Sequence, residues 1–166
     1  MPSLIVGETI ASGAETSAAF IRRIIMNEIP FYPALMMNQV DVKDCALAHL
    51  RAMERPGAAN KRFILSLEDT NLMVRIADTL QTALDKNGYD YTLRRKTIST
   101  CCLRFFGLFS RDASSIVPMV QRPPKRMINT QSREILGIEY KRTSEEFLLA
   151  AAESLMKSGS IPTVKK

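Results

Sequence analysis

Several features that mark whole classes of protein are missing from this chain of 166 residues. It has no tryptophan, one histidine and three cysteines, and two of the cysteines, Cys101 and Cys102, are adjacent. An odd number of cysteines predicts reduced thiols rather than a disulfide framework, and hence a cytoplasmic location. No apolar run approaches the roughly 18 residues that a membrane-spanning helix needs, so no membrane partner is expected.

Signals for metal binding and hydrolysis are also sparse. Cys45 and His49 lie one helical turn apart, but no third metal ligand accompanies them, so His49 is interpreted as a structural or surface residue. No serine has the glycine neighbours of a hydrolase nucleophile. The seven glycines are far apart, which excludes a glycine-rich dinucleotide turn and a phosphate-binding loop within this sequence.

The charge balance favours a basic surface without a clear polyanion site. The net charge is +6, from 23 basic and 17 acidic residues, and the basic residues stand in short scattered groups. There is no zinc-finger spacing and no interleaving of aromatic and basic residues of the RNA-binding type. Solvated surface charge is the preferred interpretation and no nucleic-acid partner is expected. A nucleic-acid binder stays as an alternative, and its affinity would fall steeply with salt.

Short apolar runs alternate with amphipathic segments along the chain. Strands are expected at residues 3–6, 39–42, 62–67 and 89–93, with a two-residue strand at 127–128. Helices are expected at residues 15–27, 44–54, 70–86, 130–136 and from 143 onward, with one or two more within 97–121. This alternation predicts an α/β fold in which residues 3–6 and 63–65 are parallel neighbours or near neighbours in one small sheet.

Two helix starts carry capping signals. Thr143 and Glu146 have the spacing of a capping box, in which each side chain satisfies a backbone N–H of the other residue. Asp44 is expected to cap the helix 44–54, and Asp41 to fix the turn before it. Two carboxylates this close also suit an acid and base pair. The structural interpretation is preferred.

Three stretches, taken in order, resemble one known family. Residues 2–7 read Pro-Ser-Leu-Ile-Val-Gly, and residues 40–49 read Val-Asp-Val-Lys-Asp-Cys-Ala-Leu-Ala-His. Residues 134–137 read Glu-Ile-Leu-Gly and precede the last helix. These resemble the Pro-x-x-Val-x-Gly-Pro, Val-Asp-Val-x-Asp-x-Ala-x-Ala-His and Leu-Gly segments of the extended short-chain dehydrogenase/reductases, the NAD(P)-dependent epimerase/dehydratase family. The dihydroflavonol-reductase-like members are the most similar subgroup, and Glu8 departs from the pattern by replacing a proline.

The resemblance covers nearly the whole chain. It implies that the chain corresponds to the C-terminal half of a family member. It implies an α/β fold made of the last strands of a Rossmann-like sheet and a small substrate lobe, with residues 1–158 in that half-domain and 159–166 a flexible tail. The family's Gly-x-x-Gly-x-x-Gly turn and its Tyr-x-x-x-Lys lie upstream of these motifs. None of the four tyrosines here is followed by a lysine four positions later. No catalytic residue is therefore expected in this chain.

The resemblance also implies where ligands would lie in a complete member. Pro2, Ser3 and Leu4 would form a wall beside the nicotinamide of NADP or NAD, and Ser17 would lie near the cofactor phosphates. Tight binding of either cofactor by this chain alone is not expected. Residues 31–37 and 94–109 fall where a small-molecule substrate would bind. Their apolar character suits a hydrophobic substrate, and core packing is the commoner explanation.

The resemblance thus predicts a fragment or truncated member of an NAD(P)-dependent oxidoreductase family acting on CH–OH or carbonyl groups, inactive by itself. The alternative is a non-catalytic interaction or binding protein derived from that family. In either case an unpaired edge at the strand 3–6 predicts self-association, because open N–H and C=O groups are a template for another strand.

Overall fold

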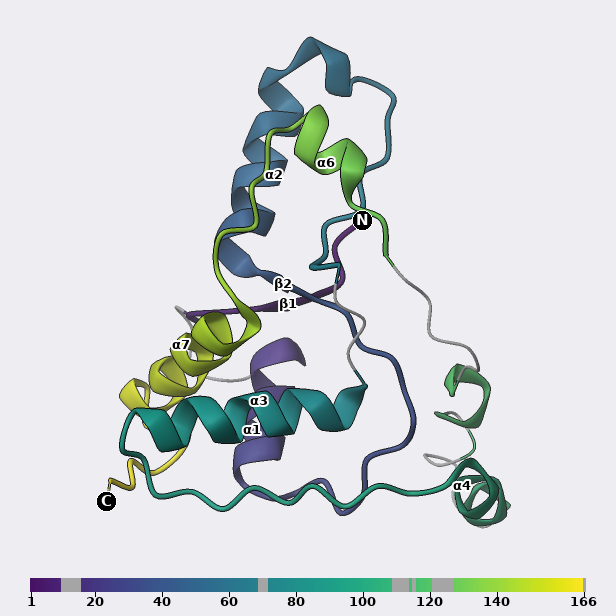
Figure 1. Cartoon of the computed structure of the whole chain (residues 1–166), viewed down its shortest axis with the longest axis vertical. Helices are drawn as coiled ribbons and strands as arrows, with labels where there is room; N and C mark the ends of the chain where they lie inside the picture. The colour runs from purple at the N-terminus through teal and green to yellow at the C-terminus, as the bar shows by residue number, and fades with distance from the viewer. Residues whose placement is uncertain (10–15, 69–71, 109–113, 115, 121–126, 166) are drawn as a thin grey trace.

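The computed structural model describes residues 1–9, 16–68, 72–108, 114, 116–120 and 127–165. Helices lie on both sides of a short parallel sheet, with α2 and α6 on one side and α1, α3 and α7 on the other (Figure 1). The bounds are β1 Leu4–Val6, α1 Thr16–Ile25, β2 Gln39–Asp41, α2 Val42–Glu54, a 3₁₀ turn Pro56–Ala58, α3 Met73–Lys86, α4 Thr100–Gly107, a 3₁₀ turn Val117–Met119, α6 Thr130–Glu134 and α7 Ser144–Lys157.

The sheet confirms the expected parallel α/β architecture. β1 pairs with β2 in parallel, Leu4 opposite Gln39 and Val6 opposite Asp41. Two consecutive parallel strands need a crossover connection, and the segment that contains α1 provides it. Within the described part of the chain, β1 has β2 along one side, whereas its other side is paired only just before the strand, where Pro2 bridges Leu65 in parallel.

The expected strand at 62–67 is reduced to that single bridging residue, Leu65. The Ser3 backbone N–H donates to the Leu65 carbonyl at 2.9 Å, and the Leu65 N–H donates to the Met1 carbonyl at 3.1 Å. The chain then bends at Ser66, and the N–H of Leu67 donates to the carbonyl of Gln39 in β2. The segment therefore changes partners after one bridge, which is too short a pairing to form a strand.

Two hydrophobic clusters cover the two faces of the sheet. The first joins α1, α3 and α7 and contains Ile21, Ile24, Ile76, Leu80, Leu84, Phe147, Leu148 and Leu155. The second lies under α2 and around α6 and contains Val40, Cys45, Ala48, Phe63, Leu65, Leu136, Ile138 and Tyr140. Val6 belongs to the first cluster and its neighbour Ile5 packs on the second, because successive side chains of a strand point to opposite faces.

The start of α2 corrects one expectation. β2 runs directly into this helix, which begins at Val42, so the N-cap is Asp41 and not Asp44. The Asp41 carboxylate accepts from the Lys43 backbone N–H at 3.2 Å. The assignment of Asp41 to a preceding turn was wrong because no turn separates the strand from the helix. The expected capping box of α7 is confirmed, with Thr143 as N-cap and Glu146 as its partner.

The helices 15–27 and 70–86 are confirmed as α1 and α3, although Glu15 and residues 70–71 lie outside the described residues. The expected strands at 89–93 and 127–128 are absent from the described chain, where Tyr89 makes one antiparallel bridge to Lys165 and no ladder follows. One bridging residue pair does not make a β-ladder, so the residues after Tyr89 do not form a strand.

Residues 159–165, expected to belong to a flexible tail, run beside the segment after α3. Ile161 is buried in the first cluster, the Tyr91 hydroxyl donates to the Pro162 carbonyl, and the Asp90 N–H donates to the Val164 carbonyl at 2.9 Å. The flexibility of this segment stays a prediction. In the described part of the chain, no helix has the length and apolar character to cross a membrane.

Candidate functional site

The carboxyl ends of β1 and β2 lie at the same edge of the sheet, which is where open α/β sheets bind their ligands. A cleft of about 270 Å³ opens there. Its walls come from the residues after β1 (Gly7, Glu8 and Thr9), from Ser17 and Ala18 in the first turn of α1, and from Val42 at the start of α2. The cleft is smaller than the roughly 300–1,000 Å³ of small-molecule pockets.

Gly7 is required at this edge by a close approach of the two chain segments. A Cβ at Gly7 would lie 2.4 Å from Cγ1 of Val42, and the residue has a positive φ of +152°. Any other side chain would push the end of β1 away from the start of α2. The glycine therefore sets the width of the cleft.

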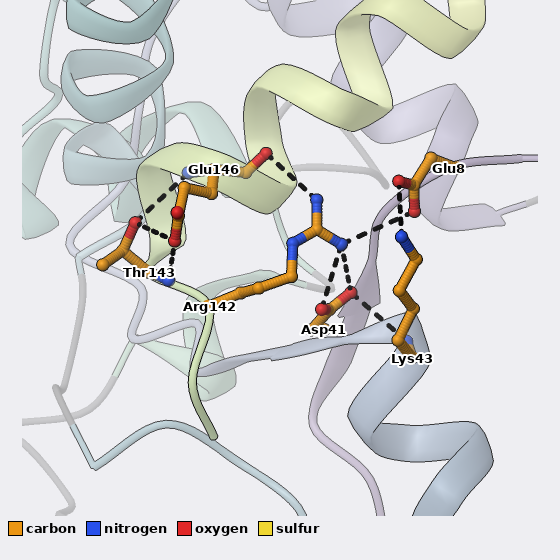
Figure 2. Close-up of polar contacts among 6 residues, drawn as sticks. All are labelled: Glu8, Asp41, Lys43, Arg142, Thr143 and Glu146. Atoms are coloured by element: carbon orange, nitrogen blue, oxygen red, sulfur yellow. Dashed lines mark hydrogen bonds and ion pairs between the residues drawn. The ribbon is translucent and has the colours of Figure 1, made fainter. Parts of the chain in front are cut away.

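A network of charged side chains lies at the same edge of the sheet (Figure 2). Nη1 of Arg142 lies 3.1 Å from Oδ2 and 3.3 Å from Oδ1 of Asp41, and 3.5 Å from Oε2 of Glu8. Nζ of Lys43 donates to Oε1 of Glu8 at 2.9 Å. The Asp41 side chain is only 2% exposed and that of Arg142 26% exposed. A buried carboxylate needs a paired cation, and Arg142 supplies it from the segment before α7.

The electrostatics of this network favour charged, paired groups over a free base. The hydrogen bond from Lys43 is the main cause that lowers the pKa of Glu8, and the charge of Arg142 adds to it. Backbone and side-chain hydrogen bonds from Thr143 lower the pKa of Glu146. Burial, and then the charge of Asp41, raises the pKa of Asp44. A lowered pKa makes the carboxylates of Glu8 and Glu146 poor proton acceptors at neutral pH, so these two residues are ion-pair and capping groups that join β1, β2 and α7.

A second, larger cavity lies next to the first cluster. It has a volume of about 600 Å³, and its walls come from α1, from the loop after it, from the start of α3 and from α4. The described residues of the lining are apolar apart from Arg23. The loop is joined to the segment before α4 by two backbone hydrogen bonds: Tyr32 N–H to the Lys96 carbonyl at 2.8 Å, and Ile98 N–H to the Tyr32 carbonyl at 3.0 Å.

Comparison with known proteins gives a fold but no close relative. No protein-family model matches the sequence, and no curated protein matches it. Among solved structures, a nucleoside-diphosphate-sugar epimerase from Pseudomonas aeruginosa superposes with a TM-score of 0.75 at 20% identity, over 95% of this chain and 47% of the epimerase. The chain has the fold of the extended short-chain dehydrogenase/reductases.

Two further structures of this fold show the same partial coverage. Yeast methylglyoxal/isovaleraldehyde reductase complexed with NADPH has a TM-score of 0.60 at 19% identity, over 96% of this chain and 42% of the reductase. UDP-glucose 4-epimerase from Thermotoga maritima with UDP-glucose has a TM-score of 0.59 at 18% identity, over 95% and 45%. The chain thus spans about half the length of the short-chain dehydrogenase/reductase structures that it matches, in agreement with a C-terminal half.

The residues that the sequence analysis places beside a cofactor are divided between two ends of β1. Ser17 lines the cleft at the carboxyl end, together with Gly7. Pro2 and Ser3 lie at the amino end, where the Ser3 hydroxyl donates to the Leu65 carbonyl at 3.1 Å, and Leu4 packs half-buried against the first cluster. A cofactor in this fold would have to extend along β1 to reach both sets, and the contacts themselves stay a prediction.

The two segments expected to form a substrate lobe do come together. Phe31 and Leu35 from the first segment, and Ile98 and Phe106 from the second, line the larger cavity. The sequence analysis did not find the Arg142 network. Its only signal was Glu8 in place of a proline, because an ion pair between residues 101 positions apart leaves no local pattern.

Cys45 and His49 contact each other within α2, at 3.8 Å between the Cys45 Sγ and the His49 Nδ1. Nδ1 of His49 also lies 2.7 Å from the Cys45 backbone carbonyl oxygen, so this ring nitrogen is engaged in a contact within α2. Among the described residues no group of three candidate ligands could hold a metal ion.

Proposed function

We propose that this chain is the substrate-lobe half of an NAD(P)-dependent oxidoreductase of the extended short-chain dehydrogenase/reductase family. It would act on CH–OH or carbonyl groups when joined to a dinucleotide-binding half, and it would be inactive alone. The observation that carries the proposal is the asymmetric coverage: 95% of this chain superposes on only 47% of the Pseudomonas epimerase. The sequence motifs place the matched part in the second half of such an enzyme.

The open side of β1 supports the need for another half. Among the described residues, the strand has no ladder partner on the side opposite β2. A parallel strand in a doubly wound sheet is normally flanked on both sides and covered on both faces. In this chain helices cover both faces of the sheet, but the edge of β1 opposite β2 has no ladder partner among the described residues. This open edge suits the addition of strands beside β1.

The residues of this chain would bind and orient rather than transfer a proton. A nicotinamide cofactor, when bound, supplies or accepts the hydride. Ser17 lies in the first turn of α1, and the first turn of a helix favours an anionic group such as a phosphate. Pro2, Ser3 and Leu4 would contact the nicotinamide end. The larger cavity would hold the substrate body and exclude water from it.

The test is to measure NADPH binding by the chain alone and by a fusion to the N-terminal half of a structural neighbour. We expect no binding tighter than millimolar for the chain alone, because the glycine turn that holds the pyrophosphate is absent from its sequence. The fusion should bind at micromolar concentrations and reduce aldehydes. A matched fusion in which the catalytic tyrosine of the added half is phenylalanine should bind NADPH equally and turn over nothing. Micromolar binding by the chain alone would contradict the proposal.

One observation favours the alternative of a non-catalytic interaction protein. α2 exposes an apolar stripe, Leu47, Leu50 and Met53, on the face away from the second cluster. Exposed stripes of this kind mark interaction surfaces. Sedimentation of the chain alone separates the two functions: self-association is expected for a half-enzyme with an open strand, whereas a stable monomer that captures a partner would favour an evolved binding module.

A further inference from the structure

The larger cavity has the construction of a ligand site rather than of a packing defect. Its volume of about 600 Å³ falls within the range of small-molecule pockets. Backbone hydrogen bonds fix the loop that forms one wall: Tyr32 joins the segment before α4, and the Met73 N–H donates to the Leu35 carbonyl at 2.8 Å. Pro30 and Pro33, both in the lining, restrict the backbone of the same loop. These restraints hold this wall in one position relative to α3 and the segment before α4.

Two aromatic rings in the lining are left uncovered. Phe31 is 48% exposed and Phe106 is 53% exposed, although both line the cavity. Leu103 and Ile29, in contrast, are buried and form its closed side. Core packing accounts for the buried pair but not for the two rings, whose faces are available to a ligand. Aromatic rings contribute large apolar areas with preferred stacking geometries, so they suit a ligand with a flat or branched apolar body.

The charge of the lining argues against a nucleotide sugar. Among the described residues, Arg23 is the one charged residue that lines the cavity, and its Nε lies 3.9 Å from Oε2 of Glu28, which partly offsets its charge. A diphosphate is normally held by several cationic or N–H donors, often in bidentate pairs. The other lining side chains in the described part of the chain are hydrocarbon or thioether groups, which cannot donate to a phosphate.

We propose that this cavity binds an uncharged aryl or branched-alkyl carbonyl compound, or the corresponding alcohol, and rejects nucleotide sugars. The carbonyl part of this inference rests on the proposed function. The choice between an apolar body and a nucleoside diphosphate rests on the lining alone. An apolar ligand of this kind corresponds to the substrates of a reductase rather than to those of a nucleotide-sugar epimerase.

Prodan, an uncharged naphthyl ketone whose emission shifts to the blue in apolar surroundings, is a suitable probe for the chain as it exists. We expect saturable binding with a blue shift. Isovaleraldehyde should compete with the dye, and UDP-glucose should not compete at the same concentration. UDP-glucose displacing the dye, or the absence of saturable dye binding, would overturn the inference.

Adjacent phenylalanines on α4 provide a matched pair of variants. Phe106 lines the cavity, whereas Phe105 does not line it and is 61% exposed. Phe106→Asp should weaken dye binding about tenfold by placing a charge in the apolar wall, and Phe105→Asp should change it by less than about twofold. Equal losses in both variants would show that the dye binds a general apolar surface. Phe31→Asp, on the opposite wall, should repeat the effect of Phe106→Asp, and circular dichroism would verify folding of each variant.

The result is independent of the cofactor test. Dye binding can fail while the fusion binds NADPH, which would overturn only the substrate class. Dye binding can also succeed while the fusion fails to bind NADPH, which would overturn the half-enzyme proposal and leave an apolar binding site.

Discussion

The helix layers on the two faces of the sheet differ in how much of their apolar surface is buried. On the side of α1, α3 and α7, Ile76, Leu80, Leu84 and Phe147 are fully buried and the helices pack against one another (Figure 1). On the side of α2 and α6, Val40 is equally buried, yet the other face of α2 presents Met53 at 85% exposure. The first layer is a finished core of fully buried side chains, whereas α2 in the second layer also carries exposed apolar side chains on its outer face. The difference identifies the outer face of α2 as an apolar surface that a partner could cover.

The largest expected effect tests the finished core. Phe147→Ala removes a fully buried ring between α7 and the helices beside it and should lower the free energy of unfolding by about 3–5 kcal/mol. Met53→Ala, on the exposed face of α2, should change it by less than about 0.5 kcal/mol. Urea denaturation followed by circular dichroism measures both. Similar losses in the two variants would mean that α2 is already covered, for example by a second copy of the chain.

The next effect concerns the sheet edge that joins the two layers. Arg142→Met leaves the buried Asp41 carboxylate without its cation and should destabilise the chain by about 2 kcal/mol, less than for a fully buried pair because Arg142 is partly exposed. Lys43→Met breaks only the exposed pair with Glu8 and should cost less than about 1 kcal/mol.

A double variant sharpens this comparison. Asp41→Asn together with Arg142→Met removes both charges, so much of the loss caused by Arg142→Met should be recovered. Simple additivity of the two single changes in urea denaturation would refute the pairing seen in Figure 2.

A smaller effect tests the side of α2 and α6, where arginines from α2 hold the turn after α6. Arg51 donates to the Leu136 carbonyl at 2.9 Å and Arg55 to the Ile135 carbonyl at 2.7 Å. Gly137 has a φ of +66°, and a Cβ there would lie 3.0 Å from Nη1 of Arg51. Gly137→Ala should therefore cost about 1–2 kcal/mol for the left-handed backbone and a further loss for the displaced guanidinium.

Gly88→Ala is the matched control for that strain. Gly88 has a φ of +74° with no atom within 4 Å of the added Cβ, so only the backbone cost applies. Thermal unfolding of both variants isolates the contribution of Arg51. Equal losses would show that the guanidinium moves aside freely.

Much of this arrangement could be predicted from the sequence, because its signals are local. A leucine or isoleucine recurs every four residues at Leu72, Ile76, Leu80 and Leu84, which predicts α3. The spacing of Thr143 and Glu146 predicts the start of α7. The parallel α/β architecture also follows from the alternation of strands and helices, although the ladder partner of residues 3–6 is β2 and not the segment 62–67. The two helix signals depend on residues within a few helical turns of each other.

The features that could not be predicted depend on distant partners. Leu65 forms a single bridge because the chain turns toward Gln39 at the next residues, which no apolar run reveals. Asp41 rather than Asp44 caps α2 because β2 ends without a turn, a detail of one or two residues. Arg142 reaches Asp41 only once α7 has packed on the sheet. The cleft at that edge is therefore a product of tertiary packing, and the apolar cavity follows partly from composition.

The smallest expected effect is a dependence of stability on pH at the start of α2. Burial and the charge of Asp41 raise the pKa of Asp44, and its Oδ2 is buried without a hydrogen-bond partner among the described residues. The folded chain therefore binds this proton more tightly than the unfolded chain does. Between the ordinary pKa of an aspartate, about 4, and the raised value, the free energy of unfolding should fall as the pH rises. Asp44→Asn cannot ionise and should remove this slope, and Glu54→Gln at the other end of α2, where no comparable burial exists, should leave it unchanged. Glu8 acts in the opposite direction, because its lowered pKa adds stability that is lost as the pH falls. Urea denaturation of the three chains from pH 3.5 to pH 7, on the order of the range set by these carboxyl groups, separates the two contributions. An unchanged slope in Asp44→Asn would show that the Asp44 carboxylate is solvated in the folded chain, and that the second layer is more open at this point than its buried Val40 suggests.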